Sequence, residues 1–284
     1  MTDHPAGAIV IAAYNEESVI GRCLEALEPV LAAGTLQVIV VCNGCTDGTA
    51  PIARTHRGVT VLDLPVASKT GALRSGDAIA VSGPRIYLDA DVVMSAPTAL
   101  AVVDALGPGG APAGRPPLEF DSSGSGRIVR SWYRVRAQLP SLSRVLWGAG
   151  TYAVSAEGRA RFGEFPDIVS DDLFVDSLFG PTERIIVPTD PVIVRAPRRT
   201  GDLLRILRRT YRSQDDVARD PGISTGQRAQ IRDLAALLRR RPSSAGDVVV
   251  YAFVILLARM QVRFARAPGP AWERDSSSRE GTLA

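Results

Sequence analysis

The sequence is poor in cysteine, histidine and lysine. Its 284 residues include three cysteines and two histidines, and Lys69 is the only lysine among 33 basic side chains. Three cysteines are too few for a disulfide-stapled scaffold, which favours a reducing compartment. A single lysine beside 32 arginines marks either a position that needs a compact ammonium group or a chance retention.

Long apolar runs are also missing. The longest, VVVYAFVILLA at 248–258, has 11 residues, fewer than the roughly 20 that cross a membrane. Because it is apolar nearly all round, we expect a packed or interfacial helix, and packing against the protein is favoured over contact with lipid. The N-terminal MTDHPAGAIVIAAYNEE has no basic leader, so we expect a buried strand there instead of a signal peptide. These features predict a soluble cytoplasmic protein with at most weak, peripheral contact with the inner membrane face.

Charge is distributed unevenly along the chain. Residues 1–100 carry six basic and ten acidic side chains, whereas residues 201–284 carry fifteen basic and nine acidic ones. A basic C-terminal part suits phosphate, a membrane surface or nucleic acid. We expect no nucleic-acid partner, because no nucleic-acid module or aromatic-interleaved basic stripe is present. The pattern predicts two parts: a domain at 1–200 and a basic helical extension at 201–284 with a disordered tail.

The first hundred residues alternate apolar runs with helical patterns. The run AIVIAAY (8–14) is typical of a strand covered on both faces. Asn15 is a candidate N-cap for a helix that continues to Gly34. Further strands are predicted at LQVIVV (36–41), VTVLDL (59–64) and RIYLDAD (85–91), with a helix from about Ser68. This order predicts an α/β fold with a mostly parallel sheet, in which ligands bind beyond the carboxyl ends of the strands.

Two pairs of acidic residues are candidates for chemistry. Asp89 and Asp91 end the fourth predicted strand, and side chains two apart on a strand share a face. An ordinary acidic strand end would explain the pair alone, but its position at the ligand edge favours Mg²⁺ binding. Asp171 and Asp172 fit the first turn of a helix, where acids are common. Their functional interpretation is a general base beside a substrate hydroxyl.

Cys42 and Cys45 form a C-x-x-C pair in VIVVCNGCTDGT (38–49). A redox pair needs an exposed cysteine at a helix N-terminus, but Cys42 ends a buried apolar run. A zinc site would need two ligands from Cys23, His4 and His56, none at finger spacing. We therefore expect the cysteines to serve as small apolar core residues.

Five segments, taken in order, resemble the family 2 glycosyltransferases, which use nucleotide-activated sugars and have a GT-A fold. They span roughly residues 8–180. AIVIAAYNEESVIGRCLEAL is similar to the opening strand, loop and helix of that family, and VIVVCNGCTDGT to its second strand and turn. SKTGALRSGDAIA, IYLDADV and VSDDLFVDSL are similar to its basic, D-x-D and catalytic-acid segments.

The resemblance implies an inverting enzyme that uses a divalent metal to move a sugar from a nucleotide-diphosphate donor to an acceptor hydroxyl. The acceptor would be a small molecule, a lipid-linked molecule or a glycan. Asp91, assisted by Asp89, would hold Mg²⁺ or Mn²⁺ on the diphosphate. Asp172 would be the base and Asp171 its support. The implied nucleotide-binding residues are Ala13, Tyr14, Glu16, Asn43, Asp47, Lys69 and Asp89.

The sequence departs from the family pattern at several positions. Asn43 stands where an acid usually contacts the nucleobase, Arg74 stands where Asn is common, and the acidic pair is Asp-Asp where Glu-Asp is commoner. The Gln-x-x-Arg-Trp signature of processive synthases is missing, and RRTYRSQ (208–214) lies in the corresponding region. This predicts one transfer per acceptor. The alternatives are a non-catalytic nucleotide-sugar binding module and a nucleotidyltransferase, which is disfavoured because no Gly-rich loop follows the first strand.

Overall fold

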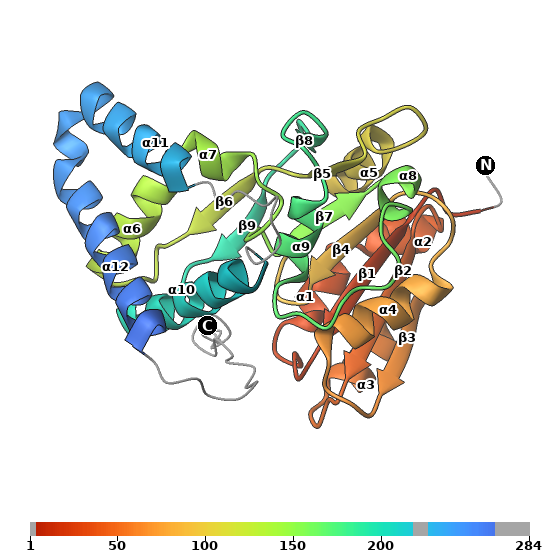
Figure 1. Ribbon diagram of the computed structural model, residues 1–284. Helices are drawn as coiled ribbons and strands as arrows, with labels where there is room; N and C mark the ends of the chain where they lie inside the picture. The colour runs from red at the N-terminus through yellow and green to blue at the C-terminus, as the bar shows by residue number, and fades with distance from the viewer. Residues whose placement is uncertain (1–3, 218–226, 265–284) are drawn as a thin grey trace. The chain divides into compact units, whose positions relative to one another are not determined.

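Seven strands form one sheet in the order β3-β2-β1-β4-β7-β5-β8 (Figure 1). β1 to β4 run parallel, whereas β7 is antiparallel to β4 and to β5, and β8 is parallel to β5. The predicted mostly parallel α/β sheet is therefore confirmed. The strands are β1 (Ala8–Ala13), β2 (Gln37–Asn43), β3 (Val59–Leu64), β4 (Arg85–Asp89), β5 (Ala113–Arg115), β7 (Thr151–Val154) and β8 (Arg184–Ile186).

The computed structural model describes residues 4–217 and 227–264. Contacts group the chain into two units, one formed by residues up to 118 with 146–194 and the other by 119–145 with the residues from 195 onward. The predicted division at residue 200 differs from this grouping, because segment 119–145 belongs with the C-terminal helices. The predicted disordered tail lies outside the described residues.

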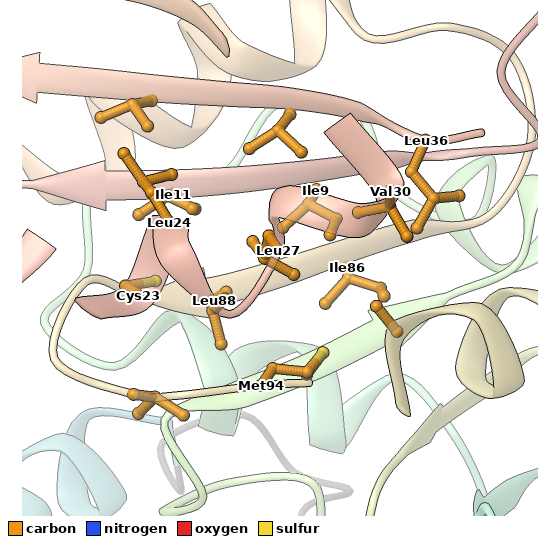
Figure 2. Packing of buried hydrophobic residues seen from close by; sticks show 14 of the residues in the cluster. Ile9, Ile11, Cys23, Leu24, Leu27, Val30, Leu36, Ile86, Leu88 and Met94 are labelled. Atoms are coloured by element: carbon orange, nitrogen blue, oxygen red, sulfur yellow. The ribbon is translucent and has the colours of Figure 1, made fainter. Parts of the chain in front are cut away.

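Helices cover both faces of the seven-stranded sheet. Alternate strand residues point to opposite faces, so Ile9 and Ile11 of β1 enter one core, which Figure 2 shows, whereas Val10 enters the other. Helices α1, α2, α3 and α5 contribute to the first core, and α4 and α9 to the second. The helices of this unit are α1 (Ile20–Glu25), α2 (Glu28–Ala33), α3 (Thr49–Thr55), α4 (Lys69–Ile79), α5 (Ala96–Ala105), α8 (Ala156–Arg159) and α9 (Asp171–Ser177).

The single helix predicted from Asn15 to Gly34 is wrong. Asn15 has a φ of 52°, and its Oδ1 accepts a hydrogen bond from Thr46 N at 2.7 Å, so it does not cap a helix. α1 begins at Ile20, and the chain starts a second helix, α2, with Pro29 in its first turn. Proline suits the first turn because its missing N–H has no helical acceptor there. Gly34 ends α2, as predicted, and it has the left-handed conformation.

The second unit is mainly helical. Its chain enters and leaves through β6 (Leu118–Asp121) and β9 (Val192–Arg195), which pair as a two-stranded sheet. α12 packs on α6 and α10, and α11 packs on α7. The helices are α6 (Arg127–Arg136), α7 (Pro140–Ser143), α10 (Thr200–Val217), α11 (Gln227–Arg240) and α12 (Ala245–Phe264), with a 3₁₀ turn at Pro242–Ser244.

The apolar run 248–258 lies within α12, which is longer than predicted. Among the described residues, the helical stretch Pro242–Phe264 is long and apolar enough to cross a membrane. Its most apolar 18-residue segment has a mean hydropathy of 1.7, and 22% of that segment is buried. The expected packing against protein holds for one face of the helix only. Val248, Tyr251, Val254 and Ala258 are buried, whereas Val249, Phe253 and Leu256 are exposed. The pattern misled because apolar residues fill both faces, and only one face packs on protein.

Candidate active site

Lys69 joins the two acidic segments. Its Nζ lies 2.8 Å from Asp89 Oδ1 at the end of β4 and 2.9 Å from Asp171 Oδ1 at the start of α9. Burial by itself would lower the pKa of Lys69, but the carboxylates of Asp171 and Asp89 outweigh it and raise that pKa above its ordinary value. Lys69 is therefore a fixed positive charge between Asp89 and Asp171, which are 82 positions apart in the sequence.

Asp171 and Asp172 have different environments although they are adjacent. Asp171 has a side chain only 3% exposed, and its Oδ2 accepts a hydrogen bond from Tyr152 Oη at 2.8 Å. Asp172 is half-buried, and its Oδ2 accepts from Gly148 N at 2.8 Å. Burial, reinforced by the neighbouring charge of Asp171, raises the pKa of Asp172 to about 6. Of the two, Asp172 has the properties of a base that gains and loses a proton near neutral pH.

Local sequence explains why Lys69 points into this site. Ser68 caps α4, with its Oγ accepting from Gly71 N at 3.0 Å. Ser68 N donates to Asn43 Oδ1 at 3.1 Å, and Asn43 Nδ2 donates to Ala13 O at 2.8 Å. The amide of Asn43 thus ties the ends of β1 and β2 to the start of α4. Asn43 is 3% exposed, and its predicted contact with a nucleobase stays a prediction.

A small pocket opens beside Lys69 at the carboxyl ends of the central strands. It brings together four of the predicted site residues: Lys69, Asp89, Asp171 and Asp172. The other residues that line it are Ala12, Leu73, Tyr87, Leu88, Gly150, Thr151 and Tyr152. A cation flanked by carboxylates in a partly enclosed space suits a ligand that carries both negative charge and hydroxyl groups.

The other predicted residues form a second group at the ends of β1 and β2. Asp47 Oδ1 accepts from Thr49 N at 3.0 Å, and Thr49 Oγ1 accepts from Glu16 N at 2.6 Å. Glu17 Oε2 accepts from Gly48 N at 2.8 Å. Despite partial burial, these hydrogen bonds from Thr49 lower the pKa of Asp47. Ala13 is buried at the end of β1, and Tyr14, which follows it, is half-buried. Hydrogen bonds therefore join the segments that follow β1 and β2.

Asp91 lies apart from the geometry that the sequence suggested. β4 ends at Asp89, and Val92 N donates to Asp89 O at 3.1 Å, so Asp91 lies in a turn and not on the strand. Asp89 and Asp91 therefore do not share one strand face, and that prediction is wrong. Burial, followed by the charges of Asp91 and Asp89, raises the pKa of the buried Cys23 thiol. Within residues 4–217 and 227–264, no group of three His, Cys, Asp or Glu residues could hold a metal by itself.

Comparison with known sequences identifies the family. Residues 8–146 match the model of the family described as glycosyl transferase family 2. Residues 8–146 therefore form a domain of the glycosyl transferase family 2 type. The resemblance predicted from the five segments is therefore confirmed, and the protein is placed among the enzymes that transfer glycosyl groups. No curated protein is similar enough in sequence to count as a match.

Solved structures show the same fold as this glycosyltransferase. The mannosyltransferase PcManGT from Pyrobaculum calidifontis, in complex with GDP-Man and Mn²⁺, is similar with a TM-score of 0.65 and 17% identity, covering 93% of this chain and 88% of that one. Glucosyl-3-phosphoglycerate synthase from Mycobacterium tuberculosis, in complex with Mn²⁺, UDP and glucosyl-3-phosphoglycerate, has a TM-score of 0.53 and 20% identity, over 77% and 81% of the two chains. The predicted GT-A fold is confirmed.

Arg74, which replaces the Asn common in family 2 glycosyltransferases, has a clear structural role. Its guanidinium donates to Phe165 O and to Asp167 Oδ1, both at 2.8 Å. Thr70 Oγ1 also donates to Asp167, at 3.3 Å. One turn of α4 therefore holds the loop that leads into the acidic pair at the start of α9.

Sequence reasoning missed Tyr152, Gly148 and Gly150 in this glycosyltransferase. Gly150 has a φ of 64°, and a Cβ there would lie 2.4 Å from Val92 Cγ2, so only glycine fits. Gly150 O accepts from Asp89 N at 2.8 Å, which joins the end of β4 to the start of β7. The two closely spaced glycines before the apolar strand TYAV were the available signal for a special backbone.

The cysteines are free, and two of them lie in the core as predicted. Cys23 and Cys42 are fully buried, whereas Cys45 is half-buried. Burial raises the pKa of Cys23 and that of Cys42 to about 12. The Cys45 thiol donates to Ala13 O at 3.4 Å and accepts from Asn15 N at 3.3 Å. Cys45 is therefore a hydrogen-bonding link in the loop, more than the small apolar filler that we expected.

We expect the double substitution Cys42→Ser with Cys45→Ser to keep glycosyl transfer and to lower the free energy of unfolding by about 1–3 kcal/mol, because it buries a hydroxyl at position 42. Cys42→Ala is the matched control, since it adds no polar group. Thermal unfolding and metal analysis of the purified proteins measure both effects. Stoichiometric zinc in the wild type that is lost in the double variant would contradict a packing role.

Proposed function

We propose that the protein is an inverting glycosyltransferase that moves one sugar per cycle from a nucleotide diphosphate to an acceptor hydroxyl. The observation that carries this proposal is the position of Lys69, which lies between Asp89 and Asp171. We assign Asp89 to the donor and the acidic pair at Asp171 to the acceptor. A retained sugar-binding fold without turnover would not require a half-buried carboxyl poised near neutral pH next to that lysine. Asp172 is such a group.

Each residue of the pocket has a distinct part in the proposed reaction. Asp172 removes the proton from the acceptor hydroxyl as its oxygen attacks the anomeric carbon of the donor. The bond from that carbon to the diphosphate breaks, and the diphosphate leaves with the electron pair. Lys69 supplies positive charge near the departing phosphate. Asp171, held by Lys69 and Tyr152, keeps the lysine in place.

The donor set at the end of β4 fits a divalent metal shared with the substrate. Asp89 and Asp91 supply hard carboxylate oxygens, which Mg²⁺ and Mn²⁺ prefer. Because the described residues offer no third acidic, His or Cys ligand in one group, the diphosphate oxygens would complete the coordination. Bound there, the metal would compensate the negative charge of the leaving group. The two similar structures contain Mn²⁺ with GDP-Man or UDP, which makes these nucleotides the first probes.

Asp91→Ala is expected to abolish the extra thermal stabilisation that Mn²⁺ adds to a nucleoside diphosphate. At a ligand concentration of about 100 Kd that stabilisation is about 2.7 kcal/mol. The measurement is thermal unfolding with GDP or UDP, with and without Mn²⁺. Asp104→Ala removes an exposed acid of α5 and serves as the control. Equal Mn²⁺ dependence in wild type and Asp91→Ala would remove Asp91 from the metal site.

The rate of transfer is expected to depend on pH through Asp172. A base must be deprotonated, so kcat/KM should fall about tenfold per pH unit below pH 6 and level off above it. Folding responds in the opposite sense. A carboxyl whose pKa rises from 3.8 to about 6 on folding favours the folded state at low pH, and this contribution is lost as pH rises through 6. A flat rate profile between pH 5 and pH 8 would argue against Asp172 as the base.

Release of nucleotide separates an enzyme from a binding module. The full chain is incubated with GDP-Man or UDP-Glc, Mn²⁺ and a panel of hydroxyl acceptors, and the released nucleoside diphosphate is measured. Release that depends on an acceptor and on Asp172 supports the enzyme. Tight donor binding without release across the panel supports the non-catalytic alternative. The length distribution of the products tests the proposed single transfer, for which the sequence evidence is the missing synthase signature.

A further inference from the structure

The outer face of α12 carries a stripe of large exposed apolar side chains. They are Val249 (67% exposed), Phe253 (63%), Leu256 (58%), Met260 (47%) and Phe264 (74%). Their spacing of three or four residues places them on one side of the helix. At 1.5 Å per residue, the stripe is about 22 Å long. A contiguous apolar surface of this kind on a soluble unit marks an interaction site.

The opposite face of α12 is anchored to its own unit. The ring of Tyr251 stacks on Trp132 of α6 at 5.3 Å. Near the other end of the helix, Gln261 Oε1 accepts from Arg208 of α10 at 2.8 Å, and the guanidinium of Arg259 lies over the Tyr211 ring at 5.0 Å. Crossing a bilayer would surround α12 with lipid and break these contacts, at a high cost for the polar groups. These contacts therefore favour a position of α12 along a surface over one across a bilayer.

Positive charge flanks both ends of the stripe. The exposed arginines 239–241 directly precede the 3₁₀ turn and α12, and Arg263 is exposed at its last turn. Arg239 Nε donates to Ala235 O and Arg241 to Gln138 Oε1, and both of these partners are uncharged. The acid at the start of α12, Asp247, faces inward and binds Arg134 and Ser131.

We propose that α12 docks flat on an anionic lipid surface. Its apolar stripe enters the boundary between headgroups and acyl chains, and the flanking arginines contact lipid phosphates. The charge arrangement favours lipid over a second copy of the chain. Antiparallel pairing of two α12 helices would bring arginines 239–241 of one copy near Arg263 of the other, and parallel pairing would bring identical arginines together. This inference does not depend on the proposed function.

Sedimentation with vesicles tests the proposal on the full chain. We expect about tenfold or greater preference for vesicles containing phosphatidylglycerol over phosphatidylcholine alone, at about 0.15 M salt. In the double variant Phe253→Ser with Leu256→Ser, the affinity for anionic vesicles should fall by about tenfold or more. The matched control is Val66→Ser with Ile79→Ser, which changes two exposed apolar residues of the other unit and should bind as wild type does. Circular dichroism verifies that each variant folds.

Two further measurements distinguish the mode of binding. Replacing arginines 239–241 by Gln should weaken binding to anionic vesicles and reduce its salt dependence. Alkaline carbonate should release the bound protein, because a helix that lies on the surface is extractable. Resistance to carbonate would mean that α12 spans the bilayer and would overturn the proposal.

Three other results would also overturn it. The first is no sedimentation of wild type with anionic vesicles, or equal sedimentation of the Phe253→Ser, Leu256→Ser variant. The second is a dimer in analytical ultracentrifugation that this variant dissociates, which would make a second copy the occupant of the stripe. The third is vesicle binding by a chain ending at Phe264 but not by the full chain, which would make the tail its occupant.

Discussion

Replacing Asp172 by Asn is expected to lower kcat by about 10²- to 10⁴-fold while leaving donor affinity within about twofold of wild type. The amide keeps the size of the side chain and can still accept from Gly148 N, which lies 2.8 Å from the carboxylate in the wild type. It cannot take a proton from the acceptor. Single-turnover kinetics, with donor binding measured by calorimetry, separate the chemical step from binding.

Asp167→Asn is the matched control for this substitution. Asp167 lies in the loop before α9, with a side chain 80% exposed, and it pairs with Arg74. Exposed pairs contribute about 0–1 kcal/mol, so the control should retain activity within about threefold. If Asp172→Asn retained more than a tenth of wild-type kcat, the base would be another group.

Replacing Lys69 by Met is expected to remove activity and to lower the free energy of unfolding by about 3 kcal/mol or more. Lys69 pairs with Asp171, whose side chain is 3% exposed, and a buried charge that loses its partner is strongly destabilising. The corresponding fall in Tm is roughly 6–12 °C for a chain of this size. Calorimetric unfolding measures the change.

A double-mutant cycle identifies the cause of this loss. In Lys69→Met with Asp171→Asn the buried carboxylate is gone, so part of the stability should return although activity does not. Lys69→Arg keeps the charge but replaces a compact ammonium by a planar fork. We expect it to be more stable than Lys69→Met and still impaired in transfer. Full activity in Lys69→Arg would favour chance retention as the reason for the single lysine.

The strands were predictable because their signals are local. The run AIVIAAY matches β1 to within one residue, and VTVLDL matches β3. The helix after β1 was not predictable, because the side chain of Asn15 binds Thr46 N, 31 positions away, instead of the next helical turn. The surface of α12 was missed for a related reason: which of its apolar faces is buried depends on α6 and α10.

The candidate site shows the same division. Its acids and Lys69 were named from the sequence by their types and their order along the chain. Their pairing was not, because Lys69 meets Asp171 across 102 positions and only the sheet brings them together. The difference between Asp171 and Asp172 also comes from the fold, since Tyr152 binds the first and Gly148 the second.

The sequence by itself determined the α/β sheet, the family and the set of acidic and basic residues, because hydrophobic periodicity and short motifs depend on neighbouring residues. The tertiary structure alone decided that Lys69 and Tyr152 bind Asp171, whereas burial raises the pKa of Asp172. It also decided that Asp91 lies beyond the strand and which face of α12 is exposed. These properties depend on burial and on charges brought close from distant parts of the chain, and burial does not exist until the chain has packed.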